Sequence, residues 1–262
     1  MKNLLKEKIK NKQKIFGTLL NMGGSYVADI YGYFGFDFVW VDTEHSPMGY
    51  KDVLDAITIL NGHNTASIVR VGMDDYNHVK RILEMGPDGI IFPNVETAEY
   101  ADKCMKATLY PPYGNRGSGP LRAVRYGLKP MMEYVDEQFD NLCRFIQIES
   151  ATAVKNLKEI IKNPYIDGYI FGPFDLSGSI GKLGDVECAE NIALIEEAIK
   201  ILKDNGKFIG MAMTSTDNAD QERWYARGAD MVCSGVDFDY IMRESKKTSE
   251  QLKELVKKYE NK

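Results

Sequence analysis

The stretch Gly35-Phe-Asp-Phe-Val-Trp-Val-Asp42 carries the pattern that decides the fold of this chain. A glycine suited to end a helix is followed by an aspartate, and then by a short strand that stays apolar up to its last residue. Strands without a polar face occur where a parallel sheet is covered by helices on both sides. The stretch therefore predicts one strand of such a sheet, with a polar side chain at its carboxyl end.

This pattern recurs along the chain. Three further segments repeat it, at Gly86–Pro93, Ile166–Gly172 and Gly228–Gly235. Four more apolar strands are predicted before and between these units, at Phe16–Asn21, Ala66–Val71, Cys143–Glu149 and Phe208–Ala212. Helical periodicity fills the remaining segments, at Ser25–Tyr33, Tyr50–Asn61, Tyr76–Met85, Ala98–Ala107, Ala151–Lys162, Asn191–Asp204, Ala219–Ala226 and Tyr240–Tyr259. Strands that alternate with helices in this way are typical of a parallel sheet.

Eight strand–helix units close most simply into a (β/α)8 TIM-type barrel of parallel strands, and 262 residues is close to the usual length of that fold. We therefore predict a single α/β barrel domain over residues 1–262. An open doubly wound sheet is the alternative, but no G-x-G-x-x-G motif follows the first predicted strand. The longest irregular stretch covers residues 110–129, and a loop of that length within a compact domain is usually functional.

Composition excludes several classes of protein. The net charge is −5 and no basic run occurs, so nucleic acid is not expected as a partner. The first ten residues are charged and amphipathic, unlike a signal peptide, and no segment approaches the roughly 18 apolar residues of a membrane span. The four cysteines have neither zinc nor CxxC spacing. We expect a cytoplasmic protein with no membrane association, in which Cys104, Cys143, Cys188 and Cys233 are buried, reduced thiols.

Polar residues gather at the carboxyl ends of the predicted strands, where barrels of this kind hold their chemistry. The side chains around that rim are Asp42, Glu44, His45, Arg70, Asn94, Gln147, Glu149 and Asp175. Gln147 and Glu149 are two residues apart on one strand, so they point to the same side. Any one of these residues has an ordinary structural explanation, such as a helix cap or an ion pair between Arg70 and Asp42. Their joint occurrence at one rim favours a functional site.

The remaining two histidines carry no such signal. His63 and His78 fall on predicted helices or at their ends, away from the strand ends. We interpret both as surface residues.

The chemistry of the rim favours a hard metal ion. Glu149 and Asp175 supply carboxylates and Gln147 supplies an amide, and such oxygen ligands suit Mg²⁺ or Mn²⁺. Zinc prefers His and Cys, which are not grouped here. A hard cation fits a substrate that chelates through a carboxylate and an adjacent keto oxygen. Arg70 can donate to the oxyanion that develops there, and His45 can move a proton. A Schiff-base aldolase would need a lysine inside the barrel, and the predicted strands contain none.

Several motifs in a fixed order identify a family resemblance. They are Phe36-Asp-Phe-Val-Trp-Val-Asp-Thr-Glu-His-Ser-Pro47, Ile68-Val-Arg70, Tyr110-Pro-Pro-Tyr-Gly-Asn-Arg-Gly117, Gln147-Ile-Glu149 and Gly172-Pro-Phe-Asp-Leu-Ser177. Over nearly its whole length the chain resembles the metal-dependent (class II) pyruvate aldolases of the 2-keto-3-deoxy acid and 4-hydroxy-2-oxo-heptanedioate aldolase family, in the citrate-lyase-like aldolase superfamily. The resemblance implies a lyase that cleaves or forms a 4-hydroxy-2-keto acid, giving pyruvate and an aldehyde through a metal-stabilised pyruvate enolate.

The resemblance also implies roles for individual residues. Glu149 and Asp175 would bind the divalent cation, which we expect to be Mg²⁺, Mn²⁺ or Co²⁺. Arg70 would stabilise the enolate and His45 would serve the acid–base step. Gln147 and Asp42 occupy positions at which the family has supporting polar residues.

Other positions depart from the family pattern or concern its assembly. The segment Pro173-Phe174 would hold the keto-acid carboxylate through its backbone, although a smaller residue is commoner at position 174. The loop after Gly119, which shapes the aldehyde side of the site, looks shorter than in the heptanedioate aldolases. Glu84 stands where the family has an acidic residue, usually Asp, that faces the His of a neighbouring subunit. The resemblance implies a homohexamer, a trimer of dimers that exchange the C-terminal helix, for which Tyr240–Tyr259 is long enough.

Two other functions remain open from the sequence. One is a condensing variant of the family, which would join oxaloacetate and an acyl-CoA to give citrate, and the motifs do not separate it well from an aldolase. A user of CoA should carry a basic or adenine-stacking groove near the mouth, and the sequence shows no clear run of that kind. The other is a non-catalytic binding barrel, against which the intact set of His45, Arg70 and metal ligands argues.

Overall fold

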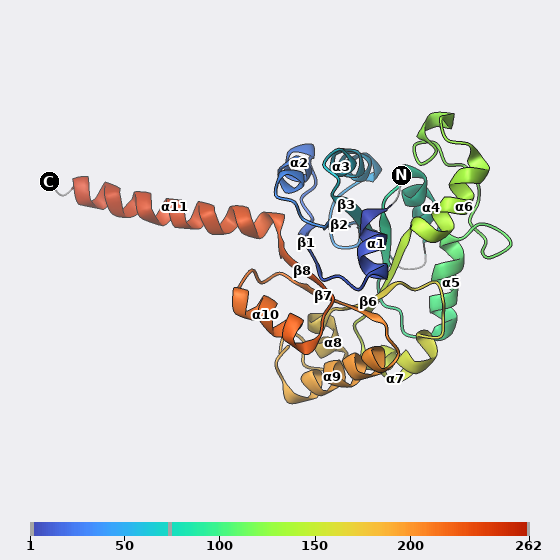
Figure 1. Ribbon diagram of the computed structural model, residues 1–262. Helices are drawn as coiled ribbons and strands as arrows, with labels where there is room; N and C mark the ends of the chain where they lie inside the picture. The colour runs from blue at the N-terminus through green and yellow to red at the C-terminus, as the bar shows by residue number, and fades with distance from the viewer. Residues whose placement is uncertain (1–2, 73–74, 261–262) are drawn as a thin grey trace.

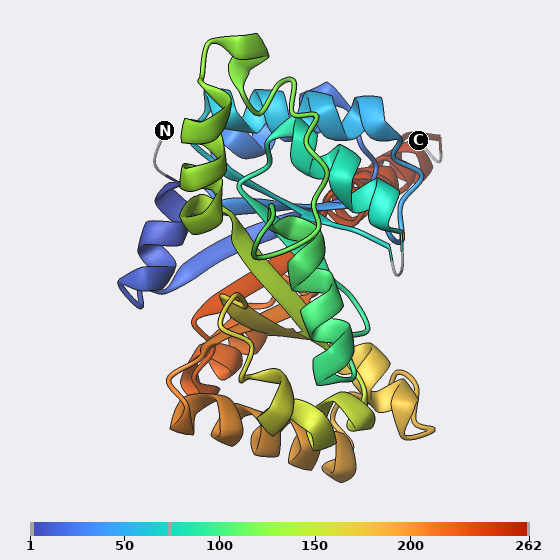
Figure 2. The same cartoon turned by 90° about the vertical axis from the view of Figure 1, so that its right-hand side faces the viewer.

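The computed structural model describes residues 3–72 and 75–260. Parallel strands form a closed barrel in which each strand pairs with the next along the chain and β8 pairs with β1 (Figures 1 and 2). The strands are β1 (Ile15–Leu20), β2 (Phe38–Asp42), β3 (Ala66–Arg70), β4 (Gly89–Phe92), β5 (Cys143–Ile148), β6 (Gly168–Phe171), β7 (Phe208–Met213) and β8 (Met231–Val236). The predicted (β/α)8 barrel is confirmed, and the open doubly wound sheet is excluded.

Helices surround the barrel (Figure 2). Those that periodicity predicts are α2 (Ser25–Tyr33), α3 (Tyr50–Gly62), α4 (Tyr76–Met85), α5 (Ala98–Thr108), α7 (Ala151–Ile160), α9 (Ala189–Asp204), α10 (Asn218–Arg227) and α11 (Asp237–Glu260). The sequence does not predict three further helices, α1 (Leu4–Lys10), α6 (Met131–Asn141) and α8 (Pro173–Ser179). Two of these, α1 and α8, have seven residues each, and so short a helix shows too little of its 3.6-residue period.

Alternate residues of each strand point into the barrel. On β2, Phe38 and Trp40 belong to the barrel interior, whereas Val39 and Val41 pack against the surrounding helices. Most of the interior is apolar and buried. The next inward positions on β2, β3 and β5, at the carboxyl end of the barrel, are Asp42, Arg70 and Gln147. The alternation therefore places three polar side chains in the top layer of an otherwise apolar core.

The amino end of the barrel is closed by α1. Leu5 and Ile9 of this helix pack with the side chains that fill the barrel interior. Lys6 of the same helix is buried, and its ammonium donates to Asp167, which precedes β6, at 2.6 Å. Because apolar contacts and a largely buried ion pair hold α1 in place, the carboxyl end is the accessible end of the barrel.

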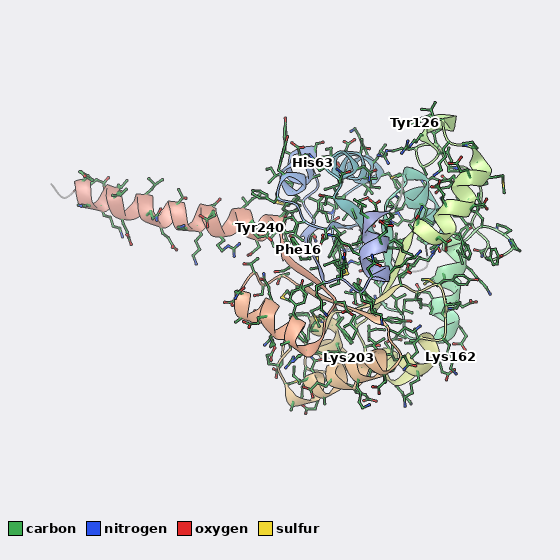
Figure 3. All side chains as sticks on the ribbon, viewed as in Figure 1. Phe16, His63, Tyr126, Lys162, Lys203 and Tyr240 are labelled. Carbon is green, nitrogen blue, oxygen red and sulfur yellow. The ribbon has the colours of Figure 1, made fainter. Side chains whose placement is uncertain are left out.

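The helix α11 stands apart from the barrel (Figure 1). Tyr240 lies at its root beside β8, and every residue from Ile241 to Glu260 is exposed (Figure 3). Its exposed side chains include large apolar ones at helical spacing: Phe238, Ile241, Met242, Leu252, Leu255, Val256 and Tyr259. Neither α11 nor any other helix in the described ranges is long and apolar enough to span a bilayer. Within the described residues, no other segment covers this amphipathic helix.

The long segment between α5 and α6 runs along α4. The Tyr76 hydroxyl, at the start of α4, accepts a hydrogen bond from the Gly117 amide at 3.1 Å. Arg122 donates to the carbonyl of Met85, at the end of the same helix, at 2.7 Å. Tyr126 marks the tip of the segment, which protrudes near α6 (Figure 3). Since α4 ends where β4 begins, this tip lies toward the amino ends of the strands and does not line the rim of its own barrel.

Two interpretations of single residue types were wrong. His63 and His78 are not surface residues, because both are partly buried and hydrogen-bonded, His63 to Asp29 at 2.6 Å. Three of the cysteines are buried as expected, but Cys188 is partly exposed because it precedes α9 at the surface. All four are free thiols.

Candidate active site

An arginine fork at the carboxyl end of the barrel organises the rim. The register pairs Asp42 directly with Arg70 on neighbouring strands. Nε and Nη2 of Arg70 donate to the two carboxylate oxygens of Asp42 at 2.8 and 2.6 Å. Such a two-point contact fixes the plane of a guanidinium as well as its position. The two residues that the sequence placed together are therefore joined, and Arg70 is held rigidly before any substrate arrives.

Burial and charge act in opposite directions on Asp42. Burial acts to raise the pKa of Asp42, but the hydrogen bonds and positive charge of Arg70 outweigh it, and the pKa lies below its ordinary value. The carboxylate also accepts hydrogen bonds from the backbone amides of Glu44 and His45. Asp42 is thus ionised and holds both Arg70 and the loop that follows β2.

The remaining side of the Arg70 guanidinium faces two other polar groups. Nη1 donates to the Gln147 amide oxygen at 3.3 Å and lies 3.1 Å from the Glu44 carboxylate. Gln147 in turn donates from Nε2 to Glu149 at 2.9 Å. Arginine can only donate and a carboxylate can only accept, so this orientation of the Gln147 amide is fixed by its neighbours. Gln147 therefore connects Arg70 with Glu149, with its amide oxygen toward Arg70 and its amide nitrogen toward Glu149.

Glu149 is a buried carboxylate that forms no ion pair with any basic side chain in residues 3–72 and 75–260. It follows β5, and its Oε1 accepts from the Asn94 amide at 2.5 Å. Asn94 has a φ of 53°, a left-handed conformation that asparagine tolerates, and this conformation aims its amide at Glu149. Burial, together with the charges of Asp175 and Glu44, raises the pKa of Glu149 to about 7, although the Asn94 amide opposes the shift. Arg70 thus compensates the charge of Glu149 less than it compensates that of Asp42.

Asp175 lies on the short helix α8, which starts at Pro173. The residue is exposed, and its charge contributes to the raised pKa of Glu149, so the two acids lie near each other. Phe174 directly precedes Asp175 in the chain. Its ring is 55% exposed and packs over Gly184, where an added Cβ would stand 3.5 Å from the ring.

His45 sits on the loop after β2 at the edge of the rim. Its ring is largely exposed, and Nε2 lies 3.8 Å from the Glu44 carboxylate, which also contacts Arg70. The pKa of Glu44 is raised, chiefly by burial and despite Arg70. Glu44 was placed at the rim by the sequence but was given no role. Its contacts depend on the direction in which the loop turns, which strand periodicity does not specify.

Two carboxylates suit an open cation site at this rim. Across residues 3–72 and 75–260, no three His, Cys, Asp or Glu side chains converge so as to hold a metal ion by themselves. Glu149 and Asp175 lie close enough for the charge of Asp175 to add to the effect of burial in raising the pKa of Glu149, and a bound cation would oppose both effects. Open magnesium sites typically use one or two carboxylates and leave the other positions to water and substrate. The residues present therefore fit a divalent cation that a substrate could reach.

Comparison with known proteins places the chain in a family. The sequence model described as HpcH/HpaI aldolase/citrate lyase matches residues 18–243. The chain belongs to this family. The chain is similar to the 4-hydroxy-2-oxo-heptane-1,7-dioate aldolase of Escherichia coli (strain ATCC 8739), with 32% identity over 245 residues, covering 93% of this chain and 92% of the relative. It is also similar to the 2-keto-3-deoxy-L-rhamnonate aldolase of Escherichia coli O17:K52:H18, with 33% identity over 237 residues, covering 90% and 87%.

A solved structure shows the same likeness. The crystal structure of an HpcH/HpaI aldolase from Desulfitobacterium hafniense DCB-2 matches with a TM-score of 0.88 and 28% identity, covering 95% of this chain and 96% of that one. Together with the aldolases named above, the match makes this HpcH/HpaI family member a carbon–carbon lyase, and the resemblance drawn from its motifs is confirmed.

Glu84 does not join the rim of its own barrel. It lies in the last turn of α4, on the outside, and its carboxylate faces Gly119 of the long segment between α5 and α6. His45 follows β2 at the carboxyl end of the strands, whereas α4 ends at the amino end. Within one chain, the two residues therefore belong to opposite ends of the barrel.

Proposed function

We propose that this family member cleaves a 4-hydroxy-2-keto acid to pyruvate and an aldehyde, through the pyruvate enolate. The observation that supports this most directly is the arrangement around Arg70. A guanidinium fixed by Asp42 lies near two acids, the buried Glu149 and the exposed Asp175. Such a site combines a cation position with a preorganised donor, which is what a developing enolate oxygen needs. The activities by which the relatives are named are of the same kind.

We propose Glu149 and Asp175 as the residues that hold the divalent cation, with Mg²⁺, Mn²⁺ or Co²⁺ as candidates. Divalent-metal dependence in the family supports this assignment. When bound, the cation supplies Lewis-acid polarisation of the keto group. The described strands contain no lysine, so a Schiff base has no nucleophile inside the barrel.

The chain's own side chains account for the other steps. Arg70 donates to the oxygen that becomes negative in the enolate, and Asp42 keeps its guanidinium in place. His45, exposed at the edge of the rim, takes the proton from the 4-hydroxyl as the carbon–carbon bond breaks. Gln147 keeps Arg70 and Glu149 in register. The backbone of Pro173–Asp175 holds the keto-acid carboxylate beside the cation.

We also propose a homohexamer in which α11 is exchanged within dimers. Support comes from the apolar stripe of α11, which nothing in the described part of the chain covers. Burial of such side chains contributes roughly 1.5–3 kcal/mol each. In an assembly of this kind, Glu84 and the long segment beside it reach the rim of another subunit, where Glu84 acts on His45. Light scattering of the full chain tests the assembly, and a monomer would contradict it.

A metal-supplemented assay tests the proposed reaction. Pyruvate release is measured with a panel of 4-hydroxy-2-keto acids that differ in the aldehyde they yield, including 4-hydroxy-2-oxo-heptanedioate and 2-keto-3-deoxy-L-rhamnonate. We expect release from at least one member. Citrate formation from oxaloacetate and an acyl-CoA, without pyruvate release from any panel member, would favour the condensing variant instead. Absence of both activities would leave a binding barrel.

A further inference from the structure

A threonine joins the ends of β2 and β3 next to the arginine fork. Thr43 follows Asp42 directly, and its backbone amide donates to the Arg70 carbonyl at 3.1 Å. Its hydroxyl donates to the same carbonyl at 2.5 Å. The residue between Asp42 and Glu44 is thus bonded twice to the main chain of Arg70.

The Thr43 hydroxyl is itself held by a histidine. Nε2 of His78, in the first turn of α4, lies 2.9 Å from Thr43 Oγ1. Nδ1 of the same ring lies 3.1 Å from the hydroxyl of Tyr50, the first residue of α3. The Asp75 side chain caps α4 by accepting from the His78 amide at 2.9 Å, which fixes where the ring starts.

The direction of each hydrogen bond in this series can be assigned in only one way. The Arg70 carbonyl only accepts, so the Thr43 hydroxyl spends its hydrogen there and must accept from His78. Burial lowers the pKa of His78, so the ring is neutral at pH 7 and has a single N–H, on Nε2. Nδ1 then accepts from the Tyr50 hydroxyl. Tyr50, His78 and Thr43 each donate once in this series, and the Arg70 carbonyl accepts the last hydrogen bond.

A stacked arginine fixes Tyr50, the outer end of this series of hydrogen bonds. The Arg81 guanidinium lies over the Tyr50 ring, 3.5 Å from its centroid. The Tyr50 ring also packs on His78, with the two centroids 5.4 Å apart. Ring contacts of this kind restrict Tyr50 and His78 to the orientation that the hydrogen bonds require.

We propose that Tyr50, His78 and Thr43 form a brace that positions Arg70 and the Asp42–His45 loop for the reaction, with His78 and Thr43 as positioning residues. The proposal rests on the proposed function, because it assigns the purpose of the brace to the enolate donor. In the described part of the chain, these three residues form no hydrogen bond with Glu149 or Asp175. The brace acts through the Arg70 main chain, at the point where the catalytic side chain leaves β3.

Because of its location, a change at Thr43 should affect catalysis. Asp42 and Glu44, its two neighbours, both contact the Arg70 guanidinium. A rotation of Thr43 therefore moves two of the groups that set the direction of the fork. Misplacement of a reacting group by about 1 Å lowers a rate by roughly 100-fold. We therefore expect loss of the Thr43 hydroxyl to lower the rate more than loss of a hydrogen bond at the protein surface.

Two substitutions at position 43 separate the hydroxyl from its volume. Thr43→Val keeps the shape and removes the hydroxyl, whereas Thr43→Ser keeps the hydroxyl. We expect Thr43→Val to lower kcat for pyruvate release by about tenfold or more, with KM changed by less than about threefold. Thr43→Ser should restore most of kcat. His78→Gln, whose amide can still donate to Thr43, should retain more activity than His78→Phe, which cannot.

A double substitution tests whether the two residues act as a unit. In Thr43→Val/His78→Phe, the loss of kcat should equal that of the more damaging single variant, because one chain of bonds is broken in both. Multiplication of the two single losses would overturn the proposal. The matched control is His63→Phe, which breaks a comparable partly buried bond, to Asp29, away from the rim. It should lower the melting temperature and leave kcat unchanged.

A crystal structure of Thr43→Val provides a readout that is independent of activity. We expect the Arg70 guanidinium to be displaced from the Asp42 carboxylate. An unchanged fork together with an unchanged kcat, even with a lower melting temperature, would make the brace purely structural and overturn the proposal. Absence of pyruvate release from the wild-type protein would instead count against the proposed function, and the displaced fork would still support the brace.

Discussion

Asp42 and Glu149 are buried carboxylates at the same rim, but they differ in their partners. Asp42 is paired with Arg70 through two hydrogen bonds, and its pKa is below the ordinary value despite burial. Glu149 accepts from neutral donors, the Asn94 amide and the Gln147 side chain, and burial raises its pKa to about 7. Arg70 thus compensates the charge of Asp42 directly, whereas Glu149 has no comparable ion pair within the described residues.

The difference shows how the work is divided within the rim. The Arg70 side is preorganised, because its charges are satisfied and its geometry is fixed before substrate binds. On the Glu149 side, burial disfavours the ionised carboxylate, and a divalent cation would stabilise it. Gln147 links the two by accepting from Arg70 and donating to Glu149.

Removal of the cation should abolish the reaction. We expect no pyruvate release after exhaustive chelation, and recovery on addition of Mg²⁺, Mn²⁺ or Co²⁺. Lewis-acid stabilisation is worth several kcal/mol, so Glu149→Gln and Asp175→Asn should each lower kcat/KM by about 1,000-fold or more. The measurement is initial-rate pyruvate release at fixed free metal concentration.

Borohydride trapping with pyruvate serves as the control for this prediction. It should give no covalent adduct, because the described strands offer no lysine inside the barrel. Full activity in the chelated protein, or a trapped adduct, would contradict the assignment of Glu149 and Asp175 as metal ligands.

Loss of the preorganised side should affect every reaction that passes through the enolate. Arg70→Ala should lower pyruvate proton exchange, oxaloacetate decarboxylation and aldol cleavage together, by roughly 100–1,000-fold, as for loss of an oxyanion donor. It should also destabilise the fold by about 3–5 kcal/mol, because Asp42 would remain buried without a partner. Rates and urea unfolding measure the two effects separately.

His45→Ala provides the comparison within the same experiment. It should reduce aldol cleavage most and decarboxylation less, because decarboxylation removes no proton from a hydroxyl. The exposed ring of His45 means that unfolding should hardly change. Equal losses in both reactions for His45→Ala would show that this division of roles is wrong.

Phe174 tests the shape of the metal side. If its ring narrows the space beside the keto acid, Phe174→Ala should raise kcat/KM for 2-oxobutanoate relative to pyruvate by about tenfold, since one methylene is worth roughly 1–3 kcal/mol. The ring packs over Gly184, which offers packing as the alternative role. An unchanged substrate ratio with a lower melting temperature would assign Phe174 to packing alone.

The dependence of metal binding on pH should show the smallest effect. The folded chain binds the Glu149 proton more tightly than the unfolded chain, whose carboxyl has the ordinary pKa of 4.5. This contribution to stability is complete below pH 4.5 and is lost as pH rises through about 7. A cation competes with that proton, so the rise in melting temperature on adding Mg²⁺ should grow between pH 5 and pH 8, by roughly 2–8 °C for about 1–2 kcal/mol.

Glu149→Gln is the control for the pH dependence, because its amide does not titrate. In that variant the effect of Mg²⁺ should be small at every pH. Asp42 should behave in the opposite way: its lowered pKa stabilises the fold above the ordinary value of 3.8, and that stability is lost at more acidic pH. If the rise in melting temperature on adding Mg²⁺ did not vary with pH in the wild type, the contrast drawn between Asp42 and Glu149 would be wrong.

Much of the fold could be predicted from local patterns. The apolar strands that end in polar residues, and the helical periods between them, gave eight strand–helix units and their approximate bounds. The short helices α1 and α8 escaped prediction because seven residues contain too little of a helical period. The rim set also followed from the sequence, since parallel strands bring their carboxyl ends to one edge.

The sequence by itself determined which residues reach the rim, because a period of two along β2, β3 and β5 places Asp42, Arg70 and Gln147 in the top layer of the barrel. The tertiary structure alone decided how they are joined. The direction of the Gln147 amide, the contact of Glu44 with Arg70 and the bond from His78 to Thr43 each depend on loops and helices distant in sequence. Strand periodicity specifies the face on which a side chain lies, but closure of the barrel sets the distances over which hydrogen bonds form.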